Sequence, residues 1–478
     1  MITPHFHNLI IGGGIAGLTY AYQHCANSTT GIVDPSPQPG GLLQPIRFPH
    51  ATVDAAAECW TLPHPELAQI ARNLALPIHS PQGQSWIYTN HQSFPIPNGS
   101  IGIPALPELF HEHPTTGRWA LRSDATPADI EAALRNNLGE VPLNPADWAI
   151  LATEPTLDPT IGADATTLAD LVEARLGINY RQNIIDPIVT RIFKLPASKL
   201  PLPMVMPWMQ AAFRKHHSVL AATAANVTPD ASMAQPIGGL WKLPQALHQY
   251  LDCRGVQFLN TEAYRIERTT ESDTWRIELP SAVVTADKLT LATPIADTLR
   301  LLTNSFPVPR IPTNSTSCHL RQRMHQVREA FLERPRRPLF LVLMDLTCAA
   351  LDDAPIGSGM LIQDPVAGSP TAISHLNIKW NLPLPAHRHL IRLSYPHEQR
   401  DLHATVCHIA HYLRVHPDQI TVHNVRSIDH TGAMDSLPPQ HKNVLLQFNE
   451  TLPNLSLVGS WVAGPGIGKI VTHAQEIR

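Results

Sequence analysis

Three glycines have the spacing of a backbone turn that binds phosphate. Gly12, Gly14 and Gly17 follow an apolar run that predicts a strand over 6–11, and a helix is predicted from 15 to about 24. The first glycine permits a tight turn, the second lets the backbone approach a pyrophosphate, and the third lets helix and strand pack closely. The helix would direct free N–H groups and its positive end at the phosphates. The sequence therefore predicts a dinucleotide site here.

An acidic residue stands where a nucleotide ribose needs a hydrogen-bond acceptor. Asp34 lies 20 residues after Gly14, at the end of a second predicted strand, Thr30–Val33. A carboxylate at this place can accept hydrogen bonds from ribose hydroxyls. A glycine pattern alone is weak, but strand, turn, helix, strand and acid in this order are specific. A glycine-rich turn without a ligand is the less favoured interpretation.

Two features favour FAD over NAD. Gly40 and Gly41 form a glycine pair in the loop 39–43, which can pass close to a cofactor. Thr293 begins a Thr-Pro turn after a predicted strand at 288–292, and FAD proteins of this kind share such a turn. The cofactor-binding residues predicted from these segments are Gly12, Gly14, Ile15, Ala16, Gly17, Asp34, Gly40, Gly41, Leu42 and Thr293.

Composition narrows the class of protein and the partners. Hydrophobic residues make up 43% of the 478 residues and the net charge is −4, which fits a folded protein and does not favour nucleic acid as a partner. The six cysteines contain no C-x-x-C pair, so neither zinc nor disulfides are expected, and the default location is the cytoplasm. The histidines lack ligand spacing, and no metal is predicted. The apolar run 339–344 is far shorter than the ~20 residues of a membrane-spanning helix, although peripheral membrane association is left open.

The order of predicted elements indicates one α/β unit interrupted twice. The FAD-binding parts are expected at 1–80, 236–300 and 431–478. A helical and substrate-binding insertion is expected at 81–235, and a substrate-binding domain at 301–430. The predicted fold class is thus α/β.

Several further motifs follow one another along the chain, among them Pro-x-Pro-x-Gly, Gly-Ile-Pro, Gly-Gly-x-x-x-Leu-Pro-x-Ala-Leu and a closing Gly-x-Gly-Ile. They lie in the segments 86–90, 94–99, 102–104, 168–176, 186–193, 238–247, 457–460 and 464–467. In these motifs and their order, the sequence resembles the protoporphyrinogen oxidase family of the FAD-dependent amine oxidase superfamily over nearly its whole length. The closing motif of that family implies that Gly466 and Ile467 bind the cofactor beside the flavin ring, and Trp461, close to this turn, is a further predicted cofactor-binding residue.

The resemblance implies a Rossmann-type FAD-binding domain with an inserted substrate-binding sheet domain and a helical capping region. It implies non-covalent FAD and transfer of hydride from a ring carbon to flavin N5, with oxygen or another acceptor taking the electrons. The cofactor carries such chemistry, so no catalytic residue is named. The implied substrate-binding residues are Ser85, Trp86, Arg191 and Phe193.

Some residues depart from the family pattern. Ser85 stands where some members have a basic residue that holds a substrate carboxylate, so Arg191 or Lys194 would have to take that role. Porphyrinogen and a different nitrogen-containing ring both remain candidate substrates. A flavin amine oxidase or dehydrogenase of a secondary-metabolite pathway, a redox-neutral mutase and a non-catalytic relative are the alternatives. The oligomeric state is left open.

Overall fold

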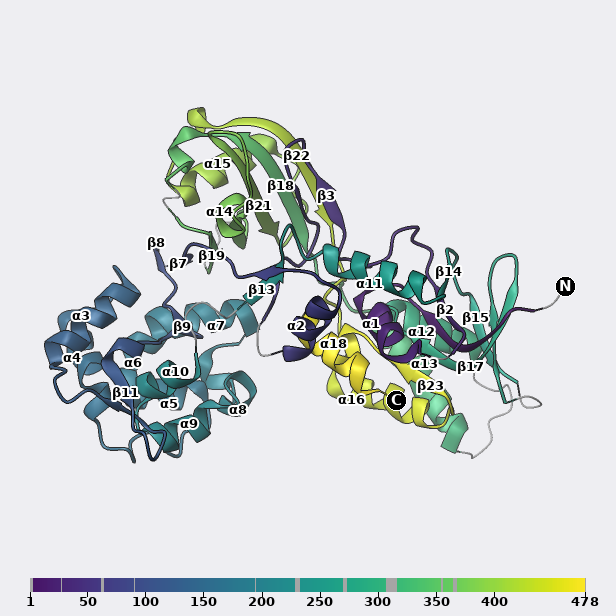
Figure 1. Cartoon of the computed structure of the whole chain (residues 1–478), viewed down its shortest axis with the longest axis horizontal. Coiled ribbons are helices and arrows are strands. Elements are labelled where there is room, and N and C mark those ends of the chain that lie inside the picture. The colour runs from purple at the N-terminus through teal and green to yellow at the C-terminus, as the bar shows by residue number, and fades with distance from the viewer. Residues whose placement is uncertain are drawn as a thin grey trace. The chain divides into compact units, whose positions relative to one another are not determined.

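The computed structural model describes residues 3–26, 28–61, 64–89, 91–193, 195–227, 233–269, 273–306, 316–353, 356–363 and 368–477. The chain divides into two compact units and passes between them repeatedly. The first unit contains Met1–His79, Met233–Leu339 and Ile428–Arg478, and the second contains Ser80–Ser232 and Phe340–Ser427. Figure 1 shows the course of the chain.

The division differs from the sequence expectation over 301–339, which belong to the first unit instead of to the second insertion. The reason is helix α13 (Thr316–Leu332), which packs against α12 (Ile295–Ser305) and α16 (Pro439–Glu450). Both insertions also join in one unit, because a strand from each contributes to the same sheet.

The first unit is built around a mostly parallel sheet. β1 lies between β2 and β17, and both run parallel to it. β14 extends the sheet beyond β2, β23 runs parallel to the end of β17, and β16 and β15 continue antiparallel on that side. These strands are β1 (His5–Ile11), β2 (Thr30–Val33), β14 (Gln257–Leu259), β15 (Arg265–Arg268), β16 (Trp275–Glu278), β17 (Val283–Leu291) and β23 (Leu455–Leu457).

Both faces of this sheet are covered, as the continuous apolar run in β1 requires. Successive side chains point to opposite faces. Ile10 packs in a core with residues of α1 (Ile15–His24), α11 (Lys242–Cys253) and α18 (Ile467–Glu476). Leu9 and Ile11 pack in another core with α12, α13 and α16. Leu9 and Ile10 are fully buried, and burying a side chain of this size stabilises the fold by roughly 1.5–3 kcal/mol.

Helices from distant parts of the sequence meet on one face of the sheet. α1 packs against both α11 and α18, and in Figure 1 the purple α1 lies beside the yellow α18. The unit also contains α2 (Pro65–Asn73) and α17 (Ser460–Ala463). Its short strands are β3 (Pro45–Arg47), β4 (Thr52–Asp54), β5 (Trp60–Thr61), β6 (Ile78–His79) and β13 (Met233–Pro236).

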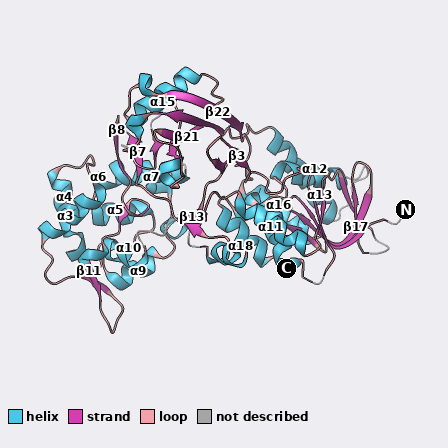
Figure 2. Ribbon diagram, turned by 45° about the horizontal axis from the view of Figure 1, so that its top comes forward, coloured by secondary structure: helices cyan, strands magenta, loops and turns pink. Residues whose placement is uncertain are grey.

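The second unit contains a mixed sheet in the order β22-β18-β21-β20-β19-β7-β8. Helix α15 lies along one face of it in Figure 2, and residues of α15 share a core with alternate residues of β18 and β21. The elements are β7 (Ser85–Thr89), β8 (Gln92–Pro95), β18 (Phe340–Thr347), β19 (Gly359–Ile362), β20 (Ala372–His375), β21 (Arg388–Tyr395), β22 (Thr421–Asp429), α14 (Leu376–Lys379) and α15 (Leu402–Leu413).

The rest of the second unit is a helical region with its own apolar core, drawn mostly in cyan in Figure 2. Buried Glu154 and Arg175 pair inside it, at 2.8 Å between the guanidinium and a carboxylate oxygen. The elements are α3 (Pro127–Leu138), α4 (Pro145–Thr153), α5 (Leu168–Leu176), α6 (Ile178–Tyr180), α7 (Asp186–Phe193), α8 (Leu202–Val205), α9 (Met209–His216), α10 (Val219–Asn226), β9 (Gly99–Ser100), β10 (Ile103–Pro104), β11 (Phe110–Glu112) and β12 (Trp119–Leu121).

The sequence predicts a single helix over 180–193, and the structure has a π-helical turn at Arg181–Ile185 between α6 and α7. Pro187 explains the interruption, because its nitrogen carries no hydrogen and cannot continue the regular bonding of the helix. An ion pair from Arg181 to Asp186 spans the turn.

Candidate functional site

The carboxyl ends of the parallel strands meet at one edge of the first unit's sheet. Ile11, the last residue of β1, is in register with Val33 of β2 and with Leu291 of β17, and Leu291 is in register with Leu457 of β23. The segments that follow these strands are the ones in which the sequence predicts cofactor-binding residues. In open α/β sheets, ligands bind outside this edge.

The turn after β1 contains the three motif glycines, and the surroundings of a Cβ differ at each of them. Gly12 has φ of +114°, and a Cβ there would lie 2.6 Å from the Ala292 carbonyl oxygen. A Cβ on Gly17 would lie 2.0 Å from the Gly12 oxygen, so close packing of helix and strand requires glycine. Gly14 differs, because a Cβ there would meet only the Gly41 Cα, at 3.9 Å. The fold leaves space beside Gly14 and fills the space beside the other two.

Asp34 has a role that the sequence did not show. One carboxylate oxygen accepts a hydrogen bond from the Gly13 N–H at 2.6 Å, and the other accepts from the Ser36 N–H at 2.8 Å. The carboxylate therefore ties the glycine turn to the loop after β2. Each oxygen has a further lone pair, so the half-buried side chain keeps the capacity to accept from a ribose hydroxyl.

The second glycine loop lies directly against the first. The Gly40 N–H donates to the Gly13 oxygen at 2.8 Å, and Gly14 and Gly40 form an isolated parallel bridge. A Cβ on Gly40 would lie 3.1 Å from the ring of Pro244 in α11. Gly41 and Leu42 are exposed beyond this contact. The two loops thus form one cradle, with the open space at Gly14.

Asp54 supports this cradle and was missed by the sequence reasoning. Its buried carboxylate accepts from the N–H groups of Leu240 at 3.0 Å and Trp241 at 2.7 Å. Leu240 and Trp241 directly precede α11, whose N-cap Trp241 makes no side-chain capping hydrogen bond. The available signal was the Gly-Gly-Leu-Trp sequence before the helix, because a helix without a local capping residue needs an acceptor from elsewhere.

The remaining predicted residues gather at the same edge of the sheet. Thr293 follows β17, and its hydroxyl pairs with that of Thr298 at 2.8 Å. Gly466 is the exposed N-cap of α18, with φ of +108°, and Ile467 begins that helix. Trp461 is 3% exposed and packs in the core with α12, α13 and α16, on the face of the sheet opposite α1. Its contact with a cofactor stays a prediction.

Known proteins resemble this chain in sequence and in fold. Residues 10–74 match the NAD(P)-binding Rossmann-like domain family. A solved structure of a candidate protoporphyrinogen oxidase from Exiguobacterium is similar at a TM-score of 0.70, with 16% identity and coverage of 99% of this chain and 98% of that one. Reduced UDP-galactopyranose mutase is similar at a TM-score of 0.60, with 13% identity, covering 100% of this chain and 93% of that one. The chain has a Rossmann-like FAD-binding fold.

Curated relatives at the sequence level are named coproporphyrinogen III oxidase. The Mycobacterium leprae protein is 24% identical over 492 residues, which covers 97% of this chain and 96% of that protein. The Mycobacterium bovis protein is 25% identical over 248 residues, which covers 50% of this chain and 48% of that protein. In the second comparison, therefore, the chain spans about half the length of the relative that it matches.

The residues present fit the dinucleotide that this FAD-binding fold implies. Helix α1 has no acidic residue in its first turn and no capping side chain, so its first N–H groups are not engaged by a cap. α18 has the same two properties. A helix start of this kind favours an anion or a developing negative charge. Together with the space at Gly14, these features suit a pyrophosphate.

The predicted substrate-binding residues lie in the second unit and are only partly brought together. Ser85 and Trp86 are neighbours on β7, so their side chains point to opposite faces of the sheet. Trp86 packs with the core beneath α15, whereas Ile87, on the Ser85 side, belongs to the helical core that Phe193 also contacts. The Ser85 hydroxyl lies 3.3 Å from that of Ser358. The side chain of Arg191 and all of Lys194 lie outside the described residues.

Two further features of the described residues bear on the sequence expectations. No group of three or more potential metal ligands is found among them. Within the same residues, no helix has the length and apolar character needed to cross a membrane.

Proposed function

We propose that the protein is an FAD-dependent oxidoreductase that oxidises a ring of a small molecule, either a porphyrinogen or a related nitrogen heterocycle. The observation that carries this proposal is the cradle at Gly14. An extended glycine faces open space there, between an uncapped helix start and a second glycine loop held by Gly13.

The chain's own residues would hold the cofactor without a covalent bond. The turn from Gly12 to Gly17 and the start of α1 would bind the pyrophosphate, and Asp34 would accept from a ribose hydroxyl. The start of α18 at Gly466 and Ile467 would face the flavin ring. When bound, FAD would supply the chemistry by accepting a hydride from a substrate carbon at N5.

Substrate orientation would be the task of the second unit. Its sheet presents Ser85 on one face, beside the helical region that contains Phe193. With a serine at this position, a substrate carboxylate would need another cation, for which Arg191 and Lys194 remain proposals. The names of the curated relatives support a porphyrinogen, with oxygen or another compound as electron acceptor. A cytoplasmic location is part of the same proposal, and peripheral membrane contact is left open.

The test begins with the absorbance spectrum of the purified protein, in which bound FAD is expected. Anaerobic titration with coproporphyrinogen III, protoporphyrinogen and a series of cyclic amines should then bleach the flavin with one of these compounds. If the protein carries flavin and none of these compounds bleaches it, the proposed substrate classes are contradicted. A protein that binds no FAD would contradict the whole proposal.

A second candidate is a redox-neutral flavoenzyme, which the similarity to UDP-galactopyranose mutase favours. Such an enzyme would need its flavin reduced by an external reductant and would convert substrate without net oxidation. Turnover that requires prior reduction with dithionite and consumes no acceptor would favour this candidate over an oxidase.

A further inference from the structure

The turn before α18 carries the chain from one core of the first unit to another. Trp461 of α17 packs in the core that contains residues of α16, whereas Ile467 of α18 packs in the core that contains residues of α1. The residues between the two helices, 464–466, are glycine, proline and glycine, and Pro465 and Gly466 are exposed. Exposed residues without large side chains pack little, so the end of α17 and the start of α18 set the position of this turn.

Helix α17 is four residues long and cannot satisfy its last carbonyl groups along its own backbone. The Ser460 oxygen accepts from the N–H of Gly464, the C-cap, at 2.9 Å. The Val462 oxygen accepts instead from the ammonium group of Lys442, which belongs to α16. Lysine side chains near the end of a helix can bind its last carbonyls in this way. Lys442 thus ties the end of α17 to another helix.

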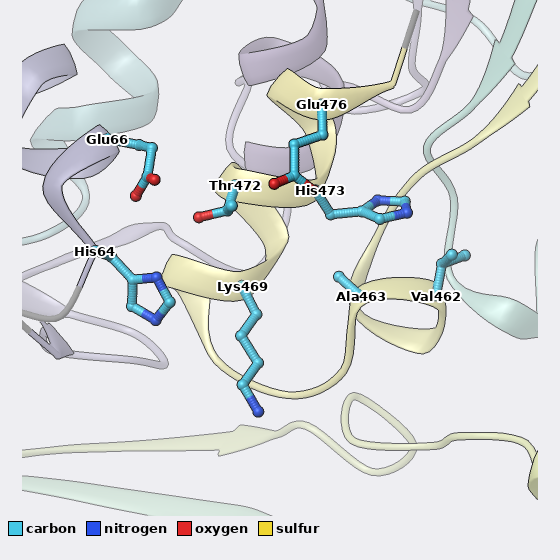
Figure 3. A pocket seen from close by; sticks show the side chains of 8 residues that line it. All are labelled: His64, Glu66, Val462, Ala463, Lys469, Thr472, His473 and Glu476. Carbon is cyan, nitrogen blue, oxygen red and sulfur yellow. The ribbon is translucent and has the colours of Figure 1, made fainter. Parts of the chain in front are cut away.

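The ammonium group of Lys442 also acts on α18. Val462, Ala463 and His473 line one pocket, and in Figure 3 the His473 side chain extends from α18 toward the segment that contains Val462. Burial, and secondarily the charge of Lys442, lowers the pKa of His473. Lys442 therefore lies where the two helices meet, because it donates to one of them and its charge acts on the other.

A lysine on the surface of a helix is usually solvated and contributes little to the structure around it. Lys442 differs, because its side chain is half-buried and its acceptor is a backbone carbonyl of the segment that leads into the turn. A hydrogen bond from a charged donor is about twice as strong as one between neutral groups. The contact is therefore suited to fixing the end of α17.

We propose that Lys442 is a positioning residue, which holds the end of α17 so that the turn 464–466 keeps the start of α18 against the flavin ring. The inference rests on the proposed FAD-dependent function. Free N–H groups at the start of α18 favour negative charge on a reduced ring. A displaced helix start would favour that charge less, and the flavin would be harder to reduce.

The first experiment asks whether Lys442 holds the turn, and it can be read whether or not flavin is bound. Hydrogen exchange is followed by mass spectrometry on the full chain as purified. In Lys442→Met, peptides that cover 459–468 should exchange at least about tenfold faster, because a charge-assisted hydrogen bond is lost. Lys442→Arg keeps a charged donor and should stay close to the wild type. Lys199→Met removes a positive charge at an exposed position of the second unit and should leave this segment unchanged.

The second experiment measures the reduction potential of the bound flavin by anaerobic equilibration with a reference dye. At the midpoint potential of the wild type, the ratio of reduced to oxidised flavin in Lys442→Met should fall by about two- to fivefold. Lys442→Arg should restore the wild-type ratio, and Lys199→Met should not change it.

The two measurements together separate positioning from other roles. Faster exchange or a lower melting temperature with an unchanged potential would overturn the proposal, since Lys442 would then support the fold alone. A shifted potential with unchanged exchange would overturn it too, because the charge would act without holding the turn. A wild-type chain that binds no flavin would contradict the proposed function and this role with it, whereas a wild-type potential in Lys442→Met contradicts only the role of Lys442.

Discussion

Gly14 shows how single residues separate folding from binding in the cofactor cradle. Its backbone is extended, with φ of −73° and ψ of 178°, a conformation that any residue can adopt. Among the described residues, a Cβ at this position would meet only the Gly41 Cα, at 3.9 Å, whereas a Cβ at Gly17 would lie 2.0 Å from the Gly12 oxygen. The two glycines therefore serve different purposes, although they belong to one motif.

We expect Gly14→Val to remove FAD without unfolding the protein, because the new side chain would occupy the space for the pyrophosphate. Gly17→Ala should instead lower the free energy of unfolding of the apoprotein, by about 1–3 kcal/mol or more, through overpacking. Flavin absorbance of the purified variants and urea unfolding of their apoproteins measure the two effects. Full flavin content in Gly14→Val would show that the cradle is not the pyrophosphate site.

A buried histidine pair in the second unit gives a residue-scale prediction about pH. Nε2 of His389 lies 3.2 Å from an Asp352 carboxylate oxygen, so its Nδ1 is the acceptor for Nε2–H of His375, at 2.9 Å. Burial, and secondarily His389, lowers the pKa of His375 to about 3. The imidazole of His375 binds a proton near pH 6.5 in the unfolded chain but only near pH 3 in the folded chain. The contribution of this group therefore lowers the free energy of unfolding as the pH drops from about 6.5 toward 3.

His375→Gln should therefore flatten the acid side of the stability profile by up to about 1.4 kcal/mol per pH unit. The measurement is the free energy of unfolding in urea between pH 5 and pH 7.5, relative to the wild type. His113→Gln, at an exposed position, serves as control and should leave the slope unchanged. An unchanged slope in His375→Gln would mean that this imidazole already carries a proton in the folded state.

The sequence predicts the glycine cradle because its residues are local and their spacing is set by backbone geometry. Asp54 and the His375–His389 pair were not predicted, because their partners are far away in the sequence and only the fold brings them together. The second role of Asp34 was missed for a related reason. A carboxylate at the end of a strand can accept from a ligand or from a backbone N–H group, and only the structure shows the bond to Gly13.

At the scale of elements, α11 connects Asp54, at the end of β4, to the loop that contains Gly40. Asp54 accepts hydrogen bonds from the two N–H groups that directly precede the helix, and Pro244, within its first turn, contacts Gly40. The position of the loop that completes the cradle therefore depends on a carboxylate that does not touch it.

Asp54→Asn should weaken FAD binding, because an amide has only one acceptor oxygen for the two N–H groups that the carboxylate serves. The loss of one charge-assisted hydrogen bond is worth about 1.5–3 kcal/mol. FAD affinity of the apoprotein, measured by quenching of flavin fluorescence, reports the effect beside the melting temperature. Asp252→Asn makes the same charge change at an exposed position near the other end of α11, and it should alter neither quantity. Equal FAD affinity in both variants would contradict the proposed support.

Elements were predicted best where hydrophobic periodicity was strong. The strand at Thr30–Val33 has the predicted bounds, and the helix of 15–24 corresponds to α1. The sequence predicts strands at 288–292 and 339–343, whereas β17 begins at Val283 and β18 ends at Thr347, because polar residues such as Asp287 and Asp345 are part of these strands. The alternation along β7 was also overlooked, and it places Ser85 and Trp86 on opposite faces.

At the scale of the whole molecule, each unit has cores formed from its own residues. Glu154 in the helical core is fully buried and accepts from Arg175, from the Ser218 hydroxyl at 2.6 Å and from the Val219 N–H at 2.8 Å. These contacts stay within the second unit, whereas the predicted cofactor cradle lies in the first.

Glu154→Gln should lower the free energy of unfolding by about 3–5 kcal/mol, because it leaves the Arg175 charge buried without its counter-charge. The flavin content of the folded protein should be unchanged. Glu131→Gln removes an exposed ion pair with Arg135 and should cost no more than about 1 kcal/mol. Thermal unfolding and the flavin absorbance of the purified variants measure these effects. A similar loss of stability in both variants would contradict the larger contribution to the free energy of unfolding that is expected of the buried pair.

The interleaving of segments in the first unit has a consequence for biosynthesis. β1 pairs with β17, whose residues in register lie 280 positions later, and β17 pairs in turn with β23, a further 166 positions along. Because α18 packs against α1, the nascent Gly12–Gly17 turn lacks this neighbour until Ile467 and the residues after it have been synthesised. During that time the apolar surfaces of β1 and α1 are exposed to other nascent chains, a situation in which large proteins misfold and chaperones act. A chain arrested before residue 467 would carry the complete phosphate-binding motif and still lack α18, so retention of a yellow colour would report synthesis through α18 as well as correct folding.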